Sequence, residues 1–175
     1  AITAAEGGAS VLVAEAAPRA YRGGNSRHTR NFRCKHDGPK SVLTGAYGED
    51  EIIDDLMRVT KGRPDQDLLR RPIRASEGCL DWMLSKGVRF QPSLSGTLSL
   101  SRTNAFFLGG GKALLNALYL TAESLGVEVL YDAEVTHLHL EDGFFTHAEL
   151  SVAGAARVNG VCGLWRLSGG LRMAV

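Results

Sequence analysis

An acidic residue, a glycine pair and several arginines lie close together in the first forty residues. The short apolar run VLVAE, residues 11–15, ends in Glu15 and predicts a strand buried on both faces. Before it, residues 1–8 (AITAAEGG) predict the last turns of a helix closed by a glycine pair. A carboxylate at the end of a strand is able to accept hydrogen bonds from a ligand's hydroxyl groups. The alternative is a strand that simply meets solvent at this residue.

The helix–strand–carboxylate order matches the second half of a dinucleotide-binding βαβ unit. In such a unit the acidic residue that ends the second strand accepts hydrogen bonds from ribose hydroxyls. The pyrophosphate lies at the helix N-terminus, next to a Gly-rich turn after the first strand. Glu15 is therefore a candidate ribose ligand, and we expect the first strand and the Gly-rich turn before Ala1.

Residues 16–40 predict a long, polar and basic loop, which is more often functional than idle. Gly23 and Gly24 allow the backbone to approach a phosphate or a flat ring, because no Cβ intervenes. Asn25 and Ser26 supply short side-chain hydrogen bonds. An ordinary surface turn is the alternative interpretation.

Several cations are candidates for binding carboxylates. An arginine offers a planar, bidentate fork. The candidates are Arg30, Arg33 and Arg102. Arg30 is preferred because it lies within the glycine-containing loop, and a solvated basic loop is the alternative for each arginine. Lys112 follows three glycines at a predicted helix start, where it either faces an anion or is solvated.

A metal site and cysteine-based redox chemistry have little support in the sequence. His137 and His139 alternate on one face of a predicted strand, but no third ligand is indicated nearby, so a solvent-facing sheet surface is favoured over a metal site. The three cysteines, Cys34, Cys79 and Cys162, have no metal or redox spacing. A reduced, cytoplasmic setting is expected.

The elements that must position these residues alternate between helices and strands, which predicts an α/β fold. Residues 49–61 predict a helix, and 65–86 a second helical region that Pro72 should kink or divide. A short strand is expected at 88–90 and an amphipathic helix at 112–125. The runs VEVLYD, AEVTHLHL and FFTHAELSV predict strands, the last two joined as a hairpin through Asp142-Gly143.

Four segments carry a resemblance to a known family. EAAPRAYRGGNS, from Glu15 on, resembles the segment after the second strand in the FAD-dependent fumarate reductase and succinate dehydrogenase flavoprotein superfamily. RGGNSRHTRNFRC is more specifically similar to the tricarballylate dehydrogenase branch. NAFFLGGGKALLNAL and LGVEVLYDAEV support the same assignment. The resemblance covers roughly residues 1–160.

The resemblance implies a partial Rossmann-like FAD/NAD(P)-binding domain with an added β-hairpin, and FAD as cofactor. It implies an oxidoreductase that acts on CH–CH bonds of a di- or tricarboxylate, with a possible redox partner. The cofactor-binding residues would be Glu15, Ala16, Arg22, Gly23, Gly24, Asn25, Ser26 and, through its backbone at the adenine, Val135. The substrate-binding candidates would be His28, Arg30 and Arg102. The turn at 109–111 would form part of the active-site wall.

His28 lies in a segment similar to the "SHT" segment through which succinate dehydrogenases attach FAD covalently. A covalent link at His28 and a substrate or solvent contact are both open. The family's substrate-capping domain and its proton-transferring arginine have no counterpart here, so no residue is assigned as catalytic.

The expected organisation is an incomplete FAD-binding domain over residues 1–160 and an atypical tail over 161–175. The tail has Ser168-Gly169-Gly170 but lacks the family's apolar strand, which indicates a frameshift or a diverged ending. A non-catalytic or inert nucleotide-binding fragment unable to hold FAD is the alternative function, and an NAD-binding module is a third.

Composition limits the remaining partners. The chain has 175 residues and a formal net charge of +1, so nucleic acid is not expected as a partner. No apolar run approaches the roughly 18 residues that span a bilayer, and no signal peptide is visible.

Overall fold

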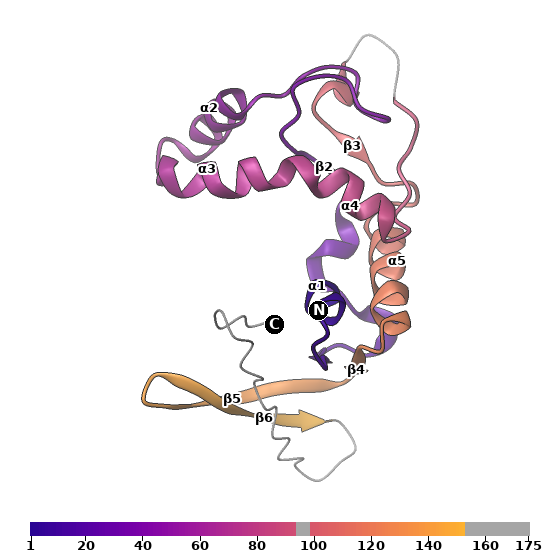
Figure 1. Cartoon of the computed structure of the whole chain (residues 1–175), viewed down its shortest axis with the longest axis vertical. Coiled ribbons are helices and arrows are strands. Elements are labelled where there is room, and N and C mark those ends of the chain that lie inside the picture. The colour runs from indigo at the N-terminus through magenta and orange to yellow at the C-terminus, as the bar shows by residue number, and fades with distance from the viewer. Residues whose placement is uncertain (94–98, 153–175) are drawn as a thin grey trace. The chain divides into compact units, whose positions relative to one another are not determined.

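The computed structural model of the chain describes residues 1–93 and 99–152 (Figure 1). The predicted tail at 161–175, with Cys162, lies outside the described residues. The chain divides into two compact units. Unit 1 combines Ala1–Asn25 with the described residues from Tyr119 on, and unit 2 is Ser26–Leu118.

Unit 1 contains a small parallel sheet. Helix α1 (Ile2–Glu6) leads into β1 (Leu12–Ala14), which confirms the predicted helix and strand. β1 pairs in parallel with β4 (Glu128–Leu130). The residues of β1 are half-buried rather than fully buried, because among the described strands β1 has one hydrogen-bonded neighbour.

The predicted hairpin is confirmed as β5 (Ala133–Glu141) and β6 (Phe144–Val152). Asp142 and Gly143 connect the strands with φ values of 51° and 80°. Both values are positive, as a type I′ turn requires.

Two bulges decide which side chains share a face of this hairpin. The strand register shifts at Thr136 on β5 and at Thr146 on β6. The cross-strand pairs consequently place eight apolar residues on one face: Ala133, Val135, Leu138, Leu140, Phe145, Ala148, Leu150 and Val152. This apolar face is buried at Ala133 and Leu150 and exposed at Leu138 and Leu140. The opposite face carries the histidines.

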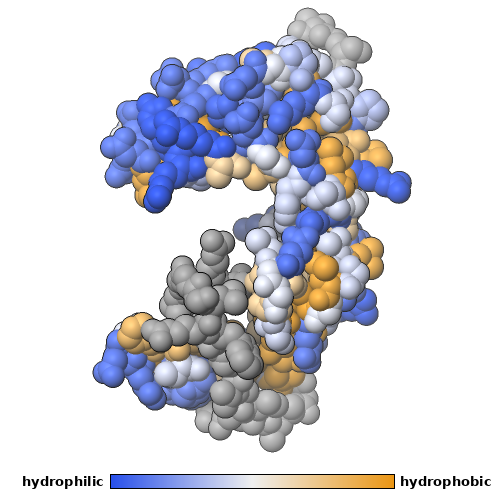
Figure 2. Space-filling model, in the orientation of Figure 1, coloured by the Kyte–Doolittle hydropathy of each residue, from blue (hydrophilic) through white to orange (hydrophobic). Residues whose placement is uncertain are grey.

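In unit 2, the helices α2 (Glu49–Thr60) and α3 (Gln66–Ala75) pack as a pair. Glu49 accepts hydrogen bonds from Arg70 and Arg74 of α3. These two guanidinium groups lower the pKa of Glu49 to about 2. Figure 2 shows mostly hydrophilic residues over both helices on the face in view.

The second helical region divides at a different place from the one predicted. α3 continues through Pro72, and the break lies at η3 (Ser76–Gly78), before α4 (Cys79–Ser85). Proline removes one backbone N–H and leaves the carbonyl of Leu68 without its helical partner. Leu68 is 69% exposed, and α3 continues through Pro72 to Ala75.

The core of unit 2 lies around β2 (Asn31–Phe32) and β3 (Ala105–Phe106), which pair antiparallel. The buried core residues are Cys34, Leu43, Leu80, Val88, Phe90, Ala105, Phe107 and Leu114. The strand predicted at 88–90 is a single bridge between Phe90 and Phe107. Three short 3-10 helices complete the described loops: η1 (Arg19–Tyr21), η2 (Gly24–His28) and η4 (Leu100–Arg102). The prediction of a loop without secondary structure over 16–40 was therefore wrong.

The amphipathic helix predicted at 112–125 is α5 (Gly110–Ser124), and the boundary between the units falls within it. Leu114 and Ala122 are buried, as expected for its inward face. None of the helices in the described part of the chain is long and apolar enough to cross a membrane. The chain thus contains both helices and strands, with small sheets, which agrees with the predicted α/β class.

Candidate functional site

Glu15 lies at the carboxyl edge of the parallel strands of unit 1. It follows β1 directly, and its backbone N–H donates to Leu130 O at 2.8 Å, at the end of β4. Tyr131 follows β4 at the same edge. In open α/β sheets, ligands bind outside the carboxyl ends of parallel strands. This edge is therefore the first place to look for a ligand site in unit 1.

The carboxylate of Glu15 is held by three neutral donors. Oε1 accepts from the Ala17 N–H at 3.0 Å. Oε2 accepts from the Gly23 N–H at 2.9 Å and from the Tyr119 hydroxyl at 3.1 Å. Partial burial opposes ionisation, but these three hydrogen bonds outweigh it and hold the pKa of Glu15 below its ordinary value. Glu15 therefore closes the loop from Ala16 to Gly23 as an ionised, half-buried acceptor.

Arg22 is packed beside Glu15 rather than projecting into solvent. Its guanidinium lies 4.2 Å from the centroid of the Tyr119 ring. Its Nη1 donates to the Tyr131 hydroxyl at 2.7 Å and lies 3.6 Å from Glu123 Oε1. The side chain is 12% exposed. In the predicted cofactor site, Arg22 would therefore act mainly by holding Tyr119 and Tyr131 in place.

The glycine pair adopts the backbone conformation for which glycine is suited. Gly23 has φ of 90° and Gly24 has φ of 49°. A Cβ at Gly24 would meet nothing within 4 Å, so the space beside this backbone is open. Ala16 and Asn25 are exposed on the same stretch of chain. The pair thus combines left-handed backbone with an accessible surface, as a close ligand approach requires.

In unit 2, Ser26 and the glycines before α5 meet directly. A Cβ at Gly111 would lie 2.1 Å from Ser26 O and 2.8 Å from the Arg27 carbonyl carbon. The Gly111 N–H donates to Thr29 O at 2.8 Å. The glycine at 111 is therefore required by the backbone of the Ser26–Thr29 segment. Two motifs that the sequence analysis identified separately lie in contact here.

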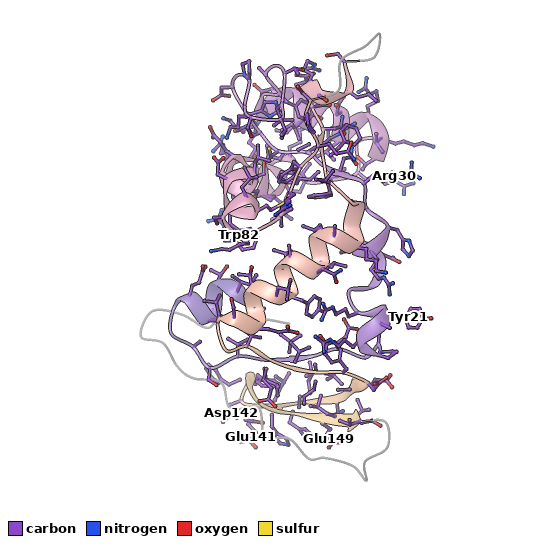
Figure 3. All side chains as sticks on the ribbon, turned by 90° about the vertical axis from the view of Figure 1, so that its right-hand side faces the viewer. Tyr21, Arg30, Trp82, Glu141, Asp142 and Glu149 are labelled. Atoms are coloured by element: carbon purple, nitrogen blue, oxygen red, sulfur yellow. The ribbon has the colours of Figure 1, made fainter. Side chains whose placement is uncertain are left out.

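The substrate candidates His28 and Arg30 are both exposed. Figure 3 shows the Arg30 side chain pointing away from the chain, as Tyr21 does. Arg30 therefore remains available to a ligand. A covalent flavin link at His28 stays a prediction.

Arg102 is engaged within unit 2. Its guanidinium donates to Glu51 through Nη1 at 3.1 Å and Nη2 at 2.5 Å, and to Ala46 O at 2.7 Å. It also lies 5.9 Å from the centroid of the Tyr47 ring. The hydrogen bond from Arg102 lowers the pKa of Glu51. A carboxylate substrate would have to displace Glu51 to use this arginine.

Arg33 is engaged in a similar way. Its Nε donates to Asn104 Oδ1 at 3.0 Å, and its Nη1 lies 3.8 Å from Asp55. Asn31 donates to the same amide oxygen of Asn104, which is 4% exposed. Lys112, the other cation considered, is exposed at the start of α5.

The histidines of the hairpin lie on its polar face. His139 stacks on His147 with ring centroids 4.0 Å apart, and His139 Nε2 lies 2.8 Å from Glu149 Oε1. Parallel stacked rings do not direct their nitrogens at one point. Within residues 1–93 and 99–152, no group of three or more His, Cys, Asp or Glu is arranged to hold a metal. Val135 lies on the opposite, apolar face and is 44% exposed.

Three further residues join these clusters without having been predicted. Tyr119 and Tyr131 complete the surroundings of Glu15 and Arg22. His36 is fully buried in unit 2, with Nδ1 2.8 Å from Cys34 O and Nε2 2.9 Å from Arg102 O. Tyr131 follows a predicted strand in the position equivalent to Glu15, which is a signal that sequence reasoning could have used. Tyr119 and His36 carry no local signal.

Comparison with a solved structure shows the fold of most of this chain. No protein-family model matches the chain. A solved structure of 3-ketosteroid-delta4-(5alpha)-dehydrogenase from Rhodococcus jostii RHA1, in complex with 4-androstene-3,17-dione, superposes with a TM-score of 0.72 at 21% identity. The match covers 88% of this chain and 39% of that one, and shows that the two share a fold over this region.

Among curated proteins, vinyl phenol reductase from Lactiplantibacillus plantarum is 27% identical over 151 residues. This match covers 83% of the chain and 29% of the reductase. The chain therefore spans well under half the length of each of these two proteins.

Proposed function

We propose that this chain forms part of the cofactor-binding region of an FAD-dependent oxidoreductase. The observation that carries the proposal is the position and state of Glu15. It lies at the carboxyl edge of two parallel strands, ionised, half-buried and fixed by neutral donors. A carboxylate in this position suits a ribose hydroxyl as donor.

The neighbouring residues fit the same cofactor. The backbone at Gly24 is accessible, and neither Gly23 nor Gly24 has a Cβ to obstruct a phosphate or a flat ring. Asn25 and Ser26 follow with short polar side chains. Bound FAD would supply hydride transfer at a carbon–carbon bond, while this chain binds and orients it. In this proposal residues 1–160 belong to the FAD-binding domain implied by the superfamily resemblance.

The names of the two similar proteins support redox chemistry, since one is a dehydrogenase and the other a reductase. A tricarballylate-like substrate is the finer proposal, and it rests on the sequence resemblance and on Arg30. Arg102 supports it less, because Glu51 already occupies its guanidinium.

FAD binding by the purified chain tests the proposal. We expect FAD to raise the melting temperature of the chain. We also expect the fluorescence of the flavin to decrease on binding. Glu15→Gln should weaken binding about 10- to 100-fold, because a hydrogen bond to a charged group is worth about 1.5–3 kcal/mol. Glu6→Gln, at an exposed position of α1, is the matched control and should bind like the wild type. A wild-type chain that FAD leaves unchanged would contradict the proposal.

A second candidate is a nucleotide-binding module without flavin chemistry, because Glu15 would recognise the ribose of any adenine nucleotide. NAD and FMN in the same melting experiment separate the two. Stabilisation by NAD beyond that by FAD favours the second candidate. Once FAD binding is established, shifts of the flavin spectrum on adding tricarballylate or vinyl phenol test the substrate class.

A further inference from the structure

Tyr119 lies where it can control the orientation of the Glu15 carboxylate. Its hydroxyl donates to Oε2, which also accepts from the Gly23 N–H. Oε1 accepts from the Ala17 N–H. A carboxylate has about four lone-pair sites. The contacts of the described residues fill two sites on Oε2 and one on Oε1, so the remaining acceptor site is on Oε1.

The Tyr119 ring is itself fixed. The guanidinium of Arg22 covers it at 4.2 Å, and the Tyr131 ring lies 6.5 Å away, centroid to centroid. Arg22 is held in turn by the Tyr131 hydroxyl at 2.7 Å. One neighbouring aromatic ring and one cation thus restrict where the Tyr119 hydroxyl points.

This hydroxyl is also a permanent donor. Partial burial and the adjacent Glu15 carboxylate raise the pKa of Tyr119 to about 12. Tyr119 therefore keeps its proton, and its hydrogen bond to Oε2, across the physiological range. The carboxylate is left with one defined orientation, in which Oε1 is the oxygen open to a further donor.

We propose that Tyr119, held by Arg22 and Tyr131, is a positioning residue that directs Glu15 Oε1 toward a ribose hydroxyl of an adenosine diphosphate group. This inference rests on the proposed function, because it assigns a role within that cofactor site. It adds the residue that orients the carboxylate and the oxygen atom that accepts the hydrogen bond from the ribose hydroxyl.

The test compares two ligands and three proteins by isothermal titration calorimetry. The ligands are ADP and 2′,3′-dideoxy-ADP, which lacks the ribose hydroxyls. Tyr119→Phe should weaken ADP binding roughly 3- to 10-fold, as expected for one lost hydrogen bond, and leave the dideoxy ligand unchanged. Tyr47→Phe, which loses a hydroxyl contact to Asp55 in unit 2, should change neither affinity.

The pH profile gives a readout that a purely structural role would not move. The Tyr119 hydroxyl helps to lower the pKa of Glu15, so its removal should raise that pKa. The acid limb of ADP binding should therefore move to higher pH in Tyr119→Phe. If this variant does not fold, Tyr131→Phe, which removes the hydrogen bond between the Tyr131 hydroxyl and Arg22, should weaken ADP binding selectively.

Three outcomes decide the matter. Selective loss of ADP affinity with a shifted acid limb supports the inference. Equal losses for both ligands, or no loss while FAD still binds the wild type, overturn it and leave the proposed function standing. A wild-type chain that binds neither ADP nor FAD overturns both.

Discussion

The two units each contain a cluster in which a guanidinium covers a tyrosine ring, and the clusters treat their carboxylates differently. In unit 1, the Glu15 cluster consists of Glu15, Arg22, Tyr119 and Tyr131. In unit 2, the Arg102 cluster consists of His36, Tyr47, Glu51 and Arg102. Glu51 is paired bidentately with its arginine. Glu15 accepts from two backbone N–H groups and one hydroxyl, with none of these donors charged.

Glu15 is therefore a hydrogen-bond acceptor with neutral partners, whereas Glu51 is one member of an ion pair. A carboxylate held by neutral donors keeps its full negative charge, and its remaining lone pair still serves a ligand. A carboxylate held by a guanidinium has its charge compensated and both oxygens engaged. In the proposed function, the same residue types therefore serve ligand binding in unit 1, whereas in unit 2 they form an internal ion pair.

The largest effect on stability is expected for His36, the fully buried residue of the Arg102 cluster. His36→Leu would remove both ring nitrogens, which lie within hydrogen-bond distance of Cys34 O and Arg102 O, and would leave a buried carbonyl without a donor, at about 1–3 kcal/mol. We expect a loss of about this size in the free energy of unfolding, measured by urea denaturation. His28→Leu, at an exposed position, should change it by about 0.5 kcal/mol or less. Similar midpoints for the two variants would show that the His36 contacts do not stabilise unit 2.

The next comparison removes one hydroxyl from each cluster. Tyr47→Phe loses a 2.7 Å hydrogen bond to Asp55, and Tyr119→Phe loses the 3.1 Å bond to Glu15. Each should cost about 0.5–1.5 kcal/mol in thermal or urea unfolding. Equal losses in the free energy of unfolding, combined with a loss of ADP affinity in Tyr119→Phe alone, would show that the two clusters contribute equally to stability and differ in ligand binding. A loss of stability in only one of the two variants would show that the two hydroxyl groups do not contribute equally to the stability of the fold.

Alkaline titration of the wild type and of Tyr119→Phe tests the raised pKa of Tyr119, and the pKa of Tyr47 is raised as well, by burial and by Asp55. The pKa of Tyr119 in the folded chain is raised to about 12 from an ordinary 10.0, by burial and by Glu15. Its contribution to stability is therefore complete below pH 10.0 and is lost as the pH rises toward 12. The ultraviolet absorbance of tyrosinate should show a late-titrating group that Tyr119→Phe removes. Persistence of that group in the variant would assign it to another tyrosine.

The smallest effect is expected at the exposed ion pair. Glu51→Gln should cost about 0.2–1 kcal/mol near neutral pH, because solvent screens a pair whose side chains are 41% and 45% exposed. The pKa of Glu51 is lowered from 4.5 by Arg102, so the pair stabilises the fold above pH 4.5 and less as the pH falls below it. The melting temperatures of wild type and variant should converge on acidification. A constant difference down to low pH would attribute the effect to packing.

Local signals in the sequence predicted much of the fold. The apolar run ending in Glu15, the Asp142-Gly143 turn and the periodicity of α5 depend on neighbours in sequence, and these predictions were confirmed. The second helical region, which Pro72 was expected to kink or divide, divides at Ser76–Gly78 instead of at Pro72. The cost of a proline within a helix depends on whether the carbonyl that it frees reaches water. That exposure is a tertiary property.

The candidate site was predictable only in part. Glu15 and the glycine pair are recognisable from their position after a strand. Tyr119 lies 104 residues from Glu15, and no periodicity of its helix distinguishes it from a neighbouring exposed residue. The arginines could not be ranked either, since the partner that occupies Arg102 lies 51 residues earlier in the chain.

The paired bulges of the β5–β6 hairpin have a consequence for comparing its sequence with those of relatives. Thr136 and Thr146 each add one residue to one strand without moving the apolar side chains to the polar face. A relative that lacks one of these residues would keep the same inward-facing set as long as its strand paired without the bulge. Single-residue insertions and deletions should therefore be tolerated at these two positions. Insertion or deletion of one residue elsewhere in either strand would instead move every side chain beyond it to the opposite face of the hairpin.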